Sequence, residues 1–417
     1  MKIAIIGGGM IGLAVGYHLS KQGAAVQVID AGDPGMACSL GNLGWLCPSL
    51  SEPVPAPGVV SMSLRWLLHG DGPLYIRPSA VPQLLPWLVQ FWRHCSPPDY
   101  AYGRDALMAL SRSSLSAFDT LAQDGVDCEL HRQGLLLVFA DRQEMRRRWE
   151  ELAPAADFGY VAAQALTQAE VLDLEPALSS RVIGGMMLPG EYHVRADTLS
   201  RALAQRIIDR GGLISARTQV ADVEVQGGSV RSLMTSSGQI QADAYVLAAG
   251  AWSAALARKV GYHLPVTAGK GYSVTIDAPR VRFHRPLYFG ETRAGLSPYV
   301  GSVRIGGTME LSGINSRLDL TRVAAVRRAV RSYLGDDLEG EAEAEWVGLR
   351  PMTADGLPVL GPVPGHDNFY VATGHAMMGI SLSQVTGALM ARLILGGSTD
   401  LDLTPFSPAR FSPRRAR

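Results

Sequence analysis

Residues 7–12 near the start of the chain have the spacing of a dinucleotide-binding turn. Gly7, Gly9 and Gly12 follow the pattern G-x-G-x-x-G, with Met10 and Ile11 between the last two glycines. The first glycine permits a tight turn, the second lets a pyrophosphate approach the backbone, and the third lets a helix pack closely on a strand. The free N–H groups at the start of such a helix bind phosphate. These residues therefore predict a dinucleotide site.

The residues on either side predict the strands and the helix that such a site requires. Residues 2–6 read as a parallel strand buried on both faces, and residues 13–23 repeat apolar positions at helical spacing. A second apolar run ends in Asp30, whose carboxylate is expected to accept hydrogen bonds from an adenosine ribose. The alternative is a structural turn that binds nothing, and the glycines alone do not separate NAD from FAD.

Arg350 is the second candidate for chemistry, because it stands in the otherwise apolar segment "GLRPMTADGLPVLG", residues 348–361. A guanidinium does not lose its proton, so burying it without a partner is costly. One candidate partner is Asp355, in a structural salt bridge. The other is a substrate carboxylate, which Arg350 would bind through two parallel hydrogen bonds.

The composition limits the classes of protein to consider. A chain of 417 residues with 47% hydrophobic and 18% charged residues is expected to fold into two globular domains. Lys plus Arg equals Asp plus Glu at 38 each, which disfavours nucleic acid as a partner. No run of about 18 uncharged apolar residues predicts a membrane span. The four cysteines have no C-x-x-C spacing, which is typical of reduced thiols in a cytoplasmic protein.

Three segments carry a resemblance to a known family: "DAGDPGMACSLGNLGWLCPSL" (30–50), "PLYIRP" (73–78) and residues 348–361. With them the chain resembles the D-amino-acid oxidase superfamily of FAD enzymes, and within it the bacterial D-amino-acid dehydrogenases and glycine oxidases. The resemblance implies an α/β fold, with a glutathione-reductase-type FAD-binding Rossmann domain and an α+β substrate domain built on a mostly antiparallel sheet. It implies that FAD is bound non-covalently, since the second half of the chain has no cysteine for a covalent link.

The family layout divides the chain into alternating segments. The FAD-binding domain is expected in residues 1–104, 194–257 and 346–417, and the substrate domain in residues 105–193 and 258–345.

The resemblance also implies further cofactor contacts. A Ser/Gly/Asn loop after the second strand is expected to cover the diphosphate and the flavin, and a helix beginning near Gly379 is expected to direct its positive end at the flavin. A purely structural C-terminal helix is the alternative. The residues expected at the cofactor, beyond the glycine turn and Asp30, are Ser39, Gly41, Asn42, Leu43, Gly44, Val220, Gly250, Trp252, Gly361, Gly374, Met377, Met378, Gly379 and Ile380.

The activity that the resemblance implies is FAD-dependent oxidation of the C–N bond of a small amino acid: a D-amino acid, glycine, or an N-substituted glycine or imino acid. Hydride passes from Cα to flavin N5, and the imine hydrolyses to a keto acid and an amine. Arg350 is expected to hold the carboxylate, and Tyr272, Tyr288 and Tyr299 are expected either to contact the substrate or only to pack. No catalytic acid or base and no metal site is expected.

Other functions remain open at this point. One is a 2-hydroxy-acid dehydrogenase on the same fold, and another is a flavin-holding subunit of a larger dehydrogenase. The electron acceptor is oxygen, a quinone or a partner protein. An apolar helical face, residues 84–92, is expected to pack in the core, with membrane contact as the alternative. The protein is then cytoplasmic, with or without a peripheral contact at the inner face of the membrane.

Overall fold

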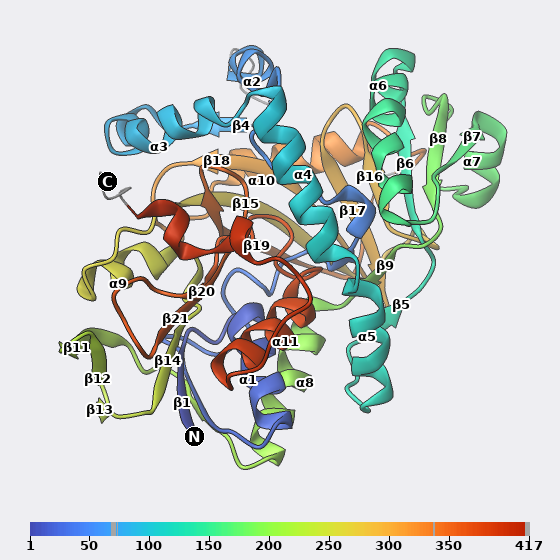
Figure 1. Cartoon of the computed structure of the whole chain (residues 1–417). Helices are drawn as coiled ribbons and strands as arrows, with labels where there is room; N and C mark the ends of the chain where they lie inside the picture. Colours follow the sequence, from blue (N-terminus) through green and yellow to red (C-terminus); the bar gives the residue numbers. More distant parts are fainter. Residues whose placement is uncertain (68–71, 73, 337, 413–417) are drawn as a thin grey trace.

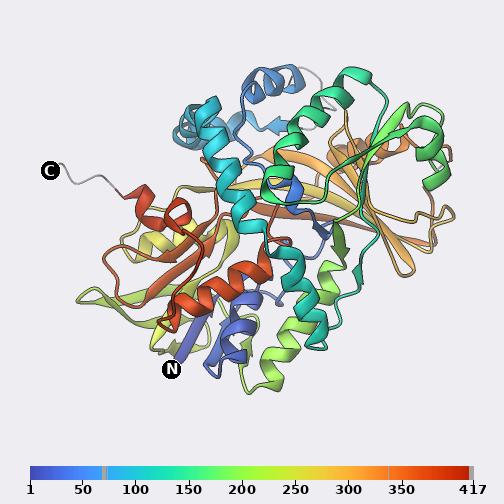
Figure 2. The same ribbon diagram turned by 45° about the vertical axis from the view of Figure 1, so that its right-hand side comes forward.

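The computed structural model describes residues 1–67, 72, 74–336 and 338–412 of the chain. Two large sheets organise it, one in the lower half of the view in Figure 1 and one in the upper half. The turned view in Figure 2 shows that the two sheets form separate layers. Residues 413–417, the end of the last expected FAD-binding segment, lie outside the described residues.

The lower sheet is the one that the N-terminal glycine pattern predicts. Its order is β10 (Leu213–Ser215), β2 (Ala25–Ile29), β1 (Lys2–Ile6), β14 (Ala244–Leu247), β21 (Phe369–Thr373) and β20 (Val359–Pro362). All neighbours are parallel except β20 and β21. Alternate residues of β1 enter two different apolar cores, which confirms a strand buried on both faces.

Helices cover one face of this sheet and a small sheet covers the other. Helix α1 (Met10–Lys21) packs against α8 (Ala196–Asp209) and α11 (Ser383–Ile394). On the opposite face lies the antiparallel sheet of β11 (Val220–Gln226), β12 (Ser229–Thr235) and β13 (Gly238–Ile240).

The upper sheet is mostly antiparallel, as expected of the substrate domain. Its pairs are antiparallel except β16 with β6 and β18 with β4. Helix α10 (Leu320–Arg331) packs on it above a second apolar core. In order across the sheet the strands are β19 (Ala342–Thr353), β15 (Val266–Asp277), β18 (Ser302–Leu311), β17 (Ala294–Tyr299), β16 (Leu287–Phe289), β6 (Leu135–Phe139), β8 (Gly184–Leu188) and β7 (Gln164–Thr167), with β4 (Leu74–Ile76) beside β18.

Strand β19 crosses one of the expected segment borders. It runs without interruption from Ala342 to Thr353, so the border at residues 345 and 346 falls inside it. Arg350 therefore lies on the upper sheet. The border at residues 104 and 105 likewise falls inside α4 (Pro97–Ser111).

The remaining elements surround the upper sheet and connect the two layers. Strands β3 (Trp45–Leu46), β9 (Tyr192–Val194) and β5 (Leu130–His131) form a short sheet of their own. The other helices are α2 (Val59–Leu67), α3 (Val81–Arg93), α5 (Ser114–Gln123), α6 (Arg142–Leu152), α7 (Gln168–Leu174) and α9 (Ser253–Lys259).

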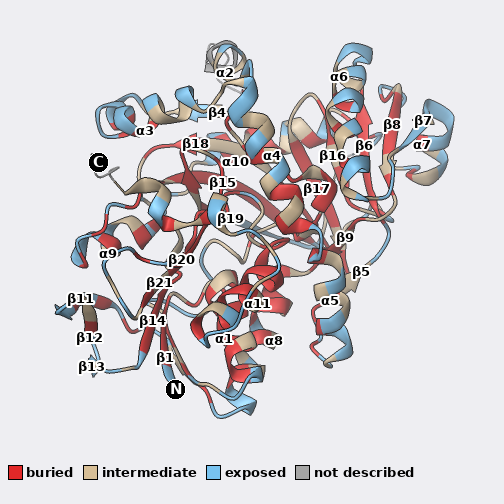
Figure 3. Ribbon diagram, viewed as in Figure 1, coloured by how far each residue is buried: buried red, intermediate tan, exposed pale blue. Residues whose placement is uncertain are grey.

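Helix α3 is only partly packed. Leu84 and Trp87 are buried, whereas Leu85, Val89 and Trp92 are exposed, and Figure 3 shows the exposed side of α3 at the edge of the molecule. The expected core packing therefore applies to one face of the helix, and the other face is apolar and uncovered. Among the described residues no helix has both the length and the apolar character that crossing a bilayer requires.

Candidate functional site

A cavity of about 1380 Å³ lies between the two large sheets. It receives residues from the glycine turn, the loop after β2, the faces of β15 and β18, and the turn before α11. The predicted site residues that line it are Gly7, Gly9, Met10, Ile11, Asp30, Ser39, Gly41, Asn42, Leu43, Val220, Gly250, Trp252, Tyr272, Tyr288, Arg350, Met377, Met378, Gly379 and Ile380.

The three glycines of the N-terminal turn differ in their surroundings. Gly7 has φ of 110°, and a Cβ on it would lie 2.5 Å from the carbonyl oxygen of Ala248. A Cβ on Gly12 would collide with the carbonyl oxygen of Gly7. Gly9 is open, because the nearest atom to a Cβ there is Ser39 Oγ at 3.9 Å. Gly7 and Gly12 thus serve close packing, and Gly9 leaves the space that a pyrophosphate needs.

The start of α1 is suited to an anion. No acidic residue lies in its first turn, and its N-cap residue, Gly9, has no side chain that could accept from the helix N–H groups. The Met10 N–H donates to Ser39 Oγ at 3.0 Å. Asp30 holds the turn together, since its carboxylate accepts from the N–H of Gly8 at 2.6 Å and of Gly32 at 2.8 Å.

Side chains from the upper sheet hold the loop after β2 in place. Arg304 is buried and donates to the carbonyl oxygens of Leu40 and Asn42 at 2.8 and 2.9 Å. Tyr299 donates its hydroxyl to the carbonyl oxygen of Leu43 at 2.7 Å. Tyr299 is not among the residues that line the cavity, and its hydroxyl positions the loop. Sequence reasoning missed Arg304, because its contacts come from residues far away in the chain.

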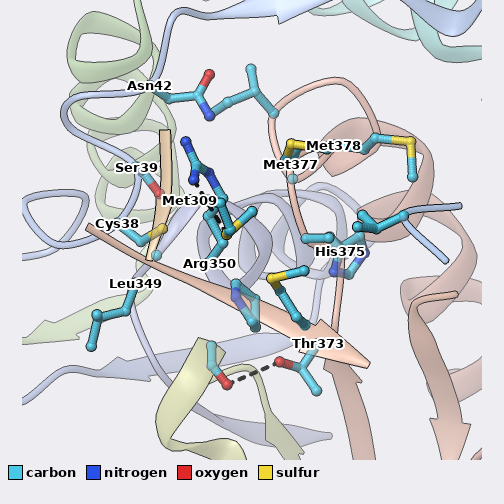
Figure 4. A pocket seen from close by; sticks show the side chains of 18 of the residues that line it. Cys38, Ser39, Asn42, Met309, Leu349, Arg350, Thr373, His375, Met377 and Met378 are labelled. Carbon is cyan, nitrogen blue, oxygen red and sulfur yellow. Dashed lines mark hydrogen bonds between the residues drawn. The ribbon is translucent and has the colours of Figure 1, made fainter. Parts of the chain in front are cut away.

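Arg350 projects into this cavity from β19. In Figure 4 its side chain lies between the Cys38–Ser39 segment and the Met377–Met378 turn. Its Nη1 donates to the carbonyl oxygen of Thr308 at 3.0 Å and lies 3.8 Å from Met309 Sδ. Among the described residues no carboxylate pairs with it. Burial lowers the pKa of Arg350, which is the cost of a cation without an anionic partner.

The two protein groups that might have neutralised Arg350 do not do so. Asp355 pairs with Arg410 instead, at 2.8 Å. Burial raises the pKa of the nearby Cys38 thiol to about 11, so this thiol is neutral at pH 7. The structural salt bridge within residues 348–361 is therefore absent, and the guanidinium retains unused donors that face the cavity.

The strands next to Arg350 leave space for its guanidinium group and bind it. A Cβ on Gly271 would overlap the guanidinium group. Thr308 has φ of 60°, a conformation that β-branched residues rarely adopt, and its carbonyl oxygen accepts from Arg350. Neither residue was predicted from the sequence. A glycine inside a strand often marks a close approach of another group, and that signal was present at Gly271.

The two other predicted tyrosines both line the cavity, but their hydroxyls already have partners. Tyr272 is buried and donates to Glu310 Oε2 at 2.6 Å, and Glu310 also pairs with the buried Lys270 at 3.4 Å. The Tyr288 hydroxyl accepts from Arg293 Nη1 at 3.1 Å.

The turn before α11 forms another wall of the cavity. Helix α11 begins at Ser383, four residues beyond the predicted start at Gly379, and the intervening turn contributes Ile380 and Ser381 to the lining. His375 lines the same wall, and its Nε2 lies 3.0 Å from Thr386 Oγ1. Its Nδ1 is buried and has no partner among the described residues. Burial lowers the pKa of His375 to about 3, so the imidazole is neutral.

Four predicted cofactor residues do not line the cavity: Gly12, Gly44, Gly361 and Gly374. Gly361 was expected to approach the cofactor, but it lies on the edge strand β20 beside Pro408. Gly44 and Gly374 have positive φ and pack against Val194 and Thr353 respectively. These glycines serve the local backbone.

Comparison with known proteins agrees with this geometry. The model of the DAO family, described as FAD dependent oxidoreductase, matches residues 2–393. The D-amino acid dehydrogenases of Granulibacter bethesdensis and Bradyrhizobium diazoefficiens are each 31% identical to this chain, covering 99% of it and 100% of their own length. The crystal structure of glycine oxidase from Geobacillus kaustophilus superposes with a TM-score of 0.78 at 28% identity, covering 99% of both chains. The chain therefore belongs to the DAO family of FAD-dependent oxidoreductases.

Proposed function

We propose that this protein oxidises the C–N bond of a small amino acid with FAD, the substrate being a D-amino acid, glycine, or an N-substituted glycine or imino acid. The product is an imine, which hydrolyses to a keto acid, or to glyoxylate from a glycine-type substrate, plus an amine. Membership of the DAO family and the similarity to D-amino acid dehydrogenases support this reaction. The observation that carries the proposal is Arg350, a cation with no carboxylate partner in the described part of the chain, facing a cavity large enough for a dinucleotide and a substrate.

The residues that line the cavity fit FAD. The open backbone at Gly9 and the uncapped start of α1 would hold the pyrophosphate, with Ser39 beside them. Asp30 would contact the adenosine ribose, and the loop at Gly41 and Asn42 would cover the flavin. FAD, when bound, supplies the acceptor for the hydride that leaves the substrate Cα. We propose that it is held non-covalently, so that denaturation releases all the flavin into the supernatant of precipitated protein.

Arg350 is proposed to bind and orient the substrate. Its fork of donors matches a carboxylate, and a pair of parallel hydrogen bonds fixes the direction of the attached Cα. The contact with Thr308 holds the guanidinium in place before substrate arrives. The protein thereby supplies orientation, which is a large part of the rate enhancement in reactions of this kind.

An amine is a better substrate than a hydroxy acid for this site. Oxidation of an alcohol needs a base to remove the hydroxyl proton, whereas an amine that enters neutral needs none. Of the histidines that the structure describes, His375 is the one that lines the cavity, and its pKa of about 3 makes it a poor base. The 2-hydroxy-acid alternative therefore has less support.

The exposed face of α3 suggests where the protein meets a membrane. Leu85, Val89 and Trp92 lie on one side of a helix whose only charged residue is Arg93. Trp92 also lines the cavity, so this face adjoins its opening. We propose a peripheral contact here for a cytoplasmic protein, with electrons passing to a quinone or a partner protein in preference to oxygen.

Anaerobic mixing tests the proposed reaction. The purified, FAD-loaded chain is mixed with D-amino acids, sarcosine, other N-alkylglycines and D-hydroxyproline, and the flavin absorption band is followed. Bleaching by members of this panel is expected, and no bleaching by any of them would reject amine oxidation. Air is then admitted to the reduced protein to distinguish the electron acceptors. Slow oxygen uptake indicates a dehydrogenase that passes electrons to a quinone or a partner protein. A chain that turns over only after a second subunit is added would be the flavin-holding subunit instead.

A further inference from the structure

The cavity continues across the upper sheet beyond Arg350. From Thr308, whose carbonyl oxygen accepts from the guanidinium, its lining continues through Gly307 and Gly306 on β18 to Gly295 on β17. Tyr288 on β16 closes the far side. Neighbouring strands are about 4.8 Å apart, so β18 and β16 are separated by roughly 10 Å. The cavity thus forms a trough that leads from Arg350 towards a second group of polar residues.

Arg148 stands at the far end of this trough, on α6, which lies beside β6 and β16 (Figure 1). It is 7% exposed. Its Nη1 donates to Glu52 at 3.2 Å and to Glu151 at 2.9 Å. All the hydrogen bonds of Arg148 to the described residues are made by Nη1. Its Nε is enclosed by protein and has no partner, so Nη2 is the nitrogen left to donate to a ligand in the cavity.

The residues around Arg148 supply further donors. Tyr288 accepts a hydrogen bond from Arg293, which leaves its own O–H proton without an acceptor among the described residues. Tyr100 lines the same end, and burial, with Glu52 and Glu151 nearby, raises the pKa of its hydroxyl, so it stays protonated. A buried hydrogen-bond donor without a partner costs free energy. These donors therefore favour a ligand that supplies hydrogen-bond acceptors.

The charges at this end balance. The cations Arg147, Arg148 and Arg293 face three glutamates, in the pairs Arg147 with Glu144 and Glu151, Arg148 with Glu52 and Glu151, and Arg293 with Glu144. The unmet need is therefore for hydrogen-bond acceptors more than for net negative charge. A carboxylate and a carboxamide both provide them.

We infer that this end of the cavity is a second anchoring subsite, in which Arg148, with Tyr288 and Tyr100, binds a carboxylate or carboxamide at the far end of the substrate. The substrate class is then an amino acid whose side chain or N-substituent ends in such a group, held at one end by Arg350 and at the other by Arg148. This inference rests on the proposed function. An apolar side chain would leave the donors of Arg148 unpaired and is selected against.

The test compares substrates that differ only in the distal group. Values of kcat/KM are measured for D-glutamate, D-glutamine, D-2-aminoadipate and the apolar D-norleucine. The best acceptor-terminated substrate should exceed D-norleucine by roughly tenfold to a hundredfold. D-glutamate against D-glutamine shows whether the charge matters. A D-norleucine value equal to the best of the others would overturn the inference.

Variants assign the preference to the named residues. Arg148→Lys keeps a cation between Glu52 and Glu151 but removes the fork, and Tyr288→Phe removes one hydroxyl. Both should reduce the preference for acceptor-terminated substrates over D-norleucine towards unity. The matched control is Arg327→Lys, whose guanidinium pairs with Glu343 and does not line the cavity. An equal loss for all substrates would mean that Arg148 is structural, and would contradict the inference.

A binding measurement separates this inference from the proposed reaction. Calorimetry compares adipate and its monoamide with hexanoate on the FAD-loaded protein. Tighter binding of the two acceptor-terminated acids, lost in Arg148→Lys, supports the subsite even if no amino acid bleaches the flavin. Equal binding of all three acids refutes it, whatever the outcome of the oxidation panel.

Discussion

The guanidinium group of Arg350 lies directly over Gly271 of the neighbouring strand β15. The strand register pairs Arg350 with Gly269 and Gly348 with Gly271, so the arginine side chain turns along β15 and covers a position that has no side chain of its own. This arrangement, together with the carbonyl oxygen of Thr308, holds the cation at the cavity wall. The proposed substrate clamp depends on this pair of residues.

Gly271→Ala tests the pair. Gly271 has no positive φ, and the atoms that a Cβ meets belong to the end of a flexible side chain, so the variant should fold with normal FAD content. The displaced guanidinium should bind the carboxylate poorly, and KM should rise about tenfold. Steady-state kinetics measure it. Gly335→Ala, at a site with free space, is the control and should behave as wild type; an unaltered KM in Gly271→Ala would show that the guanidinium does not need this space.

Two substitutions in the N-terminal turn should have opposite outcomes. Gly9→Ala adds a methyl group that meets nothing closer than Ser39 Oγ at 3.9 Å, so the protein should fold but lose FAD, because the methyl group occupies the pyrophosphate position. Gly12→Ala collides with the backbone of Gly7 and should prevent folding. Circular dichroism and flavin content per chain distinguish the two. Full FAD occupancy in Gly9→Ala would place the pyrophosphate elsewhere.

Glu191 should make stability depend on pH. Burial raises its pKa to about 7 from an ordinary value of 4.5, although the N–H and hydroxyl of Ser49 donate to it. As pH rises, Glu191 ionises in the unfolded chain before it ionises in the folded protein. The free energy of unfolding therefore falls between about pH 4.5 and pH 7 and does not fall further above pH 7. Glu191→Gln removes this loss, on the order of 3 kcal/mol, and should raise Tm at pH 8 more than at pH 5. Scanning calorimetry at both values checks this, with Glu341→Gln, an exposed acid, as the control; the same change in Tm at both pH values would contradict it.

The apolar face of α3 should bind lipid. Replacing Leu85 and Trp92 by Gln should leave Tm almost unchanged, since both side chains are exposed, but should reduce sedimentation with phospholipid vesicles about tenfold. Ile208→Gln, which removes an exposed apolar side chain from α8, should have no effect on sedimentation. Equal sedimentation of all three proteins would remove α3 from the membrane contact.

The parts of the site that were predictable from the sequence are those whose physics is local. The roles of Gly7, Gly9 and Gly12 follow from a strand, a turn and a helix adjacent in the chain, and the structure has all three. Arg350 was identifiable because a cation among apolar residues needs a partner. The mostly antiparallel character of the upper sheet was also expected, from the resemblance to the family.

The rest depends on contacts between residues far apart in the chain. Tyr299 was a reasonable candidate for the substrate, but the pairing of β17 turns its hydroxyl to the carbonyl oxygen of Leu43, 256 residues away in sequence. Arg304 was missed because its role is set by Leu40 and Asn42, more than 260 residues away. The nearest acid in the sequence, Asp355, was not the partner of Arg350, because Arg410 from the C-terminal segment takes it.

The KM of Arg350→Met, set beside that of Arg410→Met, tests the central claim most directly. The first substitution removes the proposed clamp, and the second breaks the neighbouring pair with Asp355 without touching the cavity. The account predicts that Arg350→Met retains FAD, raises KM about a hundredfold and weakens carboxylate inhibitors equally, whereas Arg410→Met lowers Tm and leaves KM near wild type. A wild-type KM in Arg350→Met would contradict it.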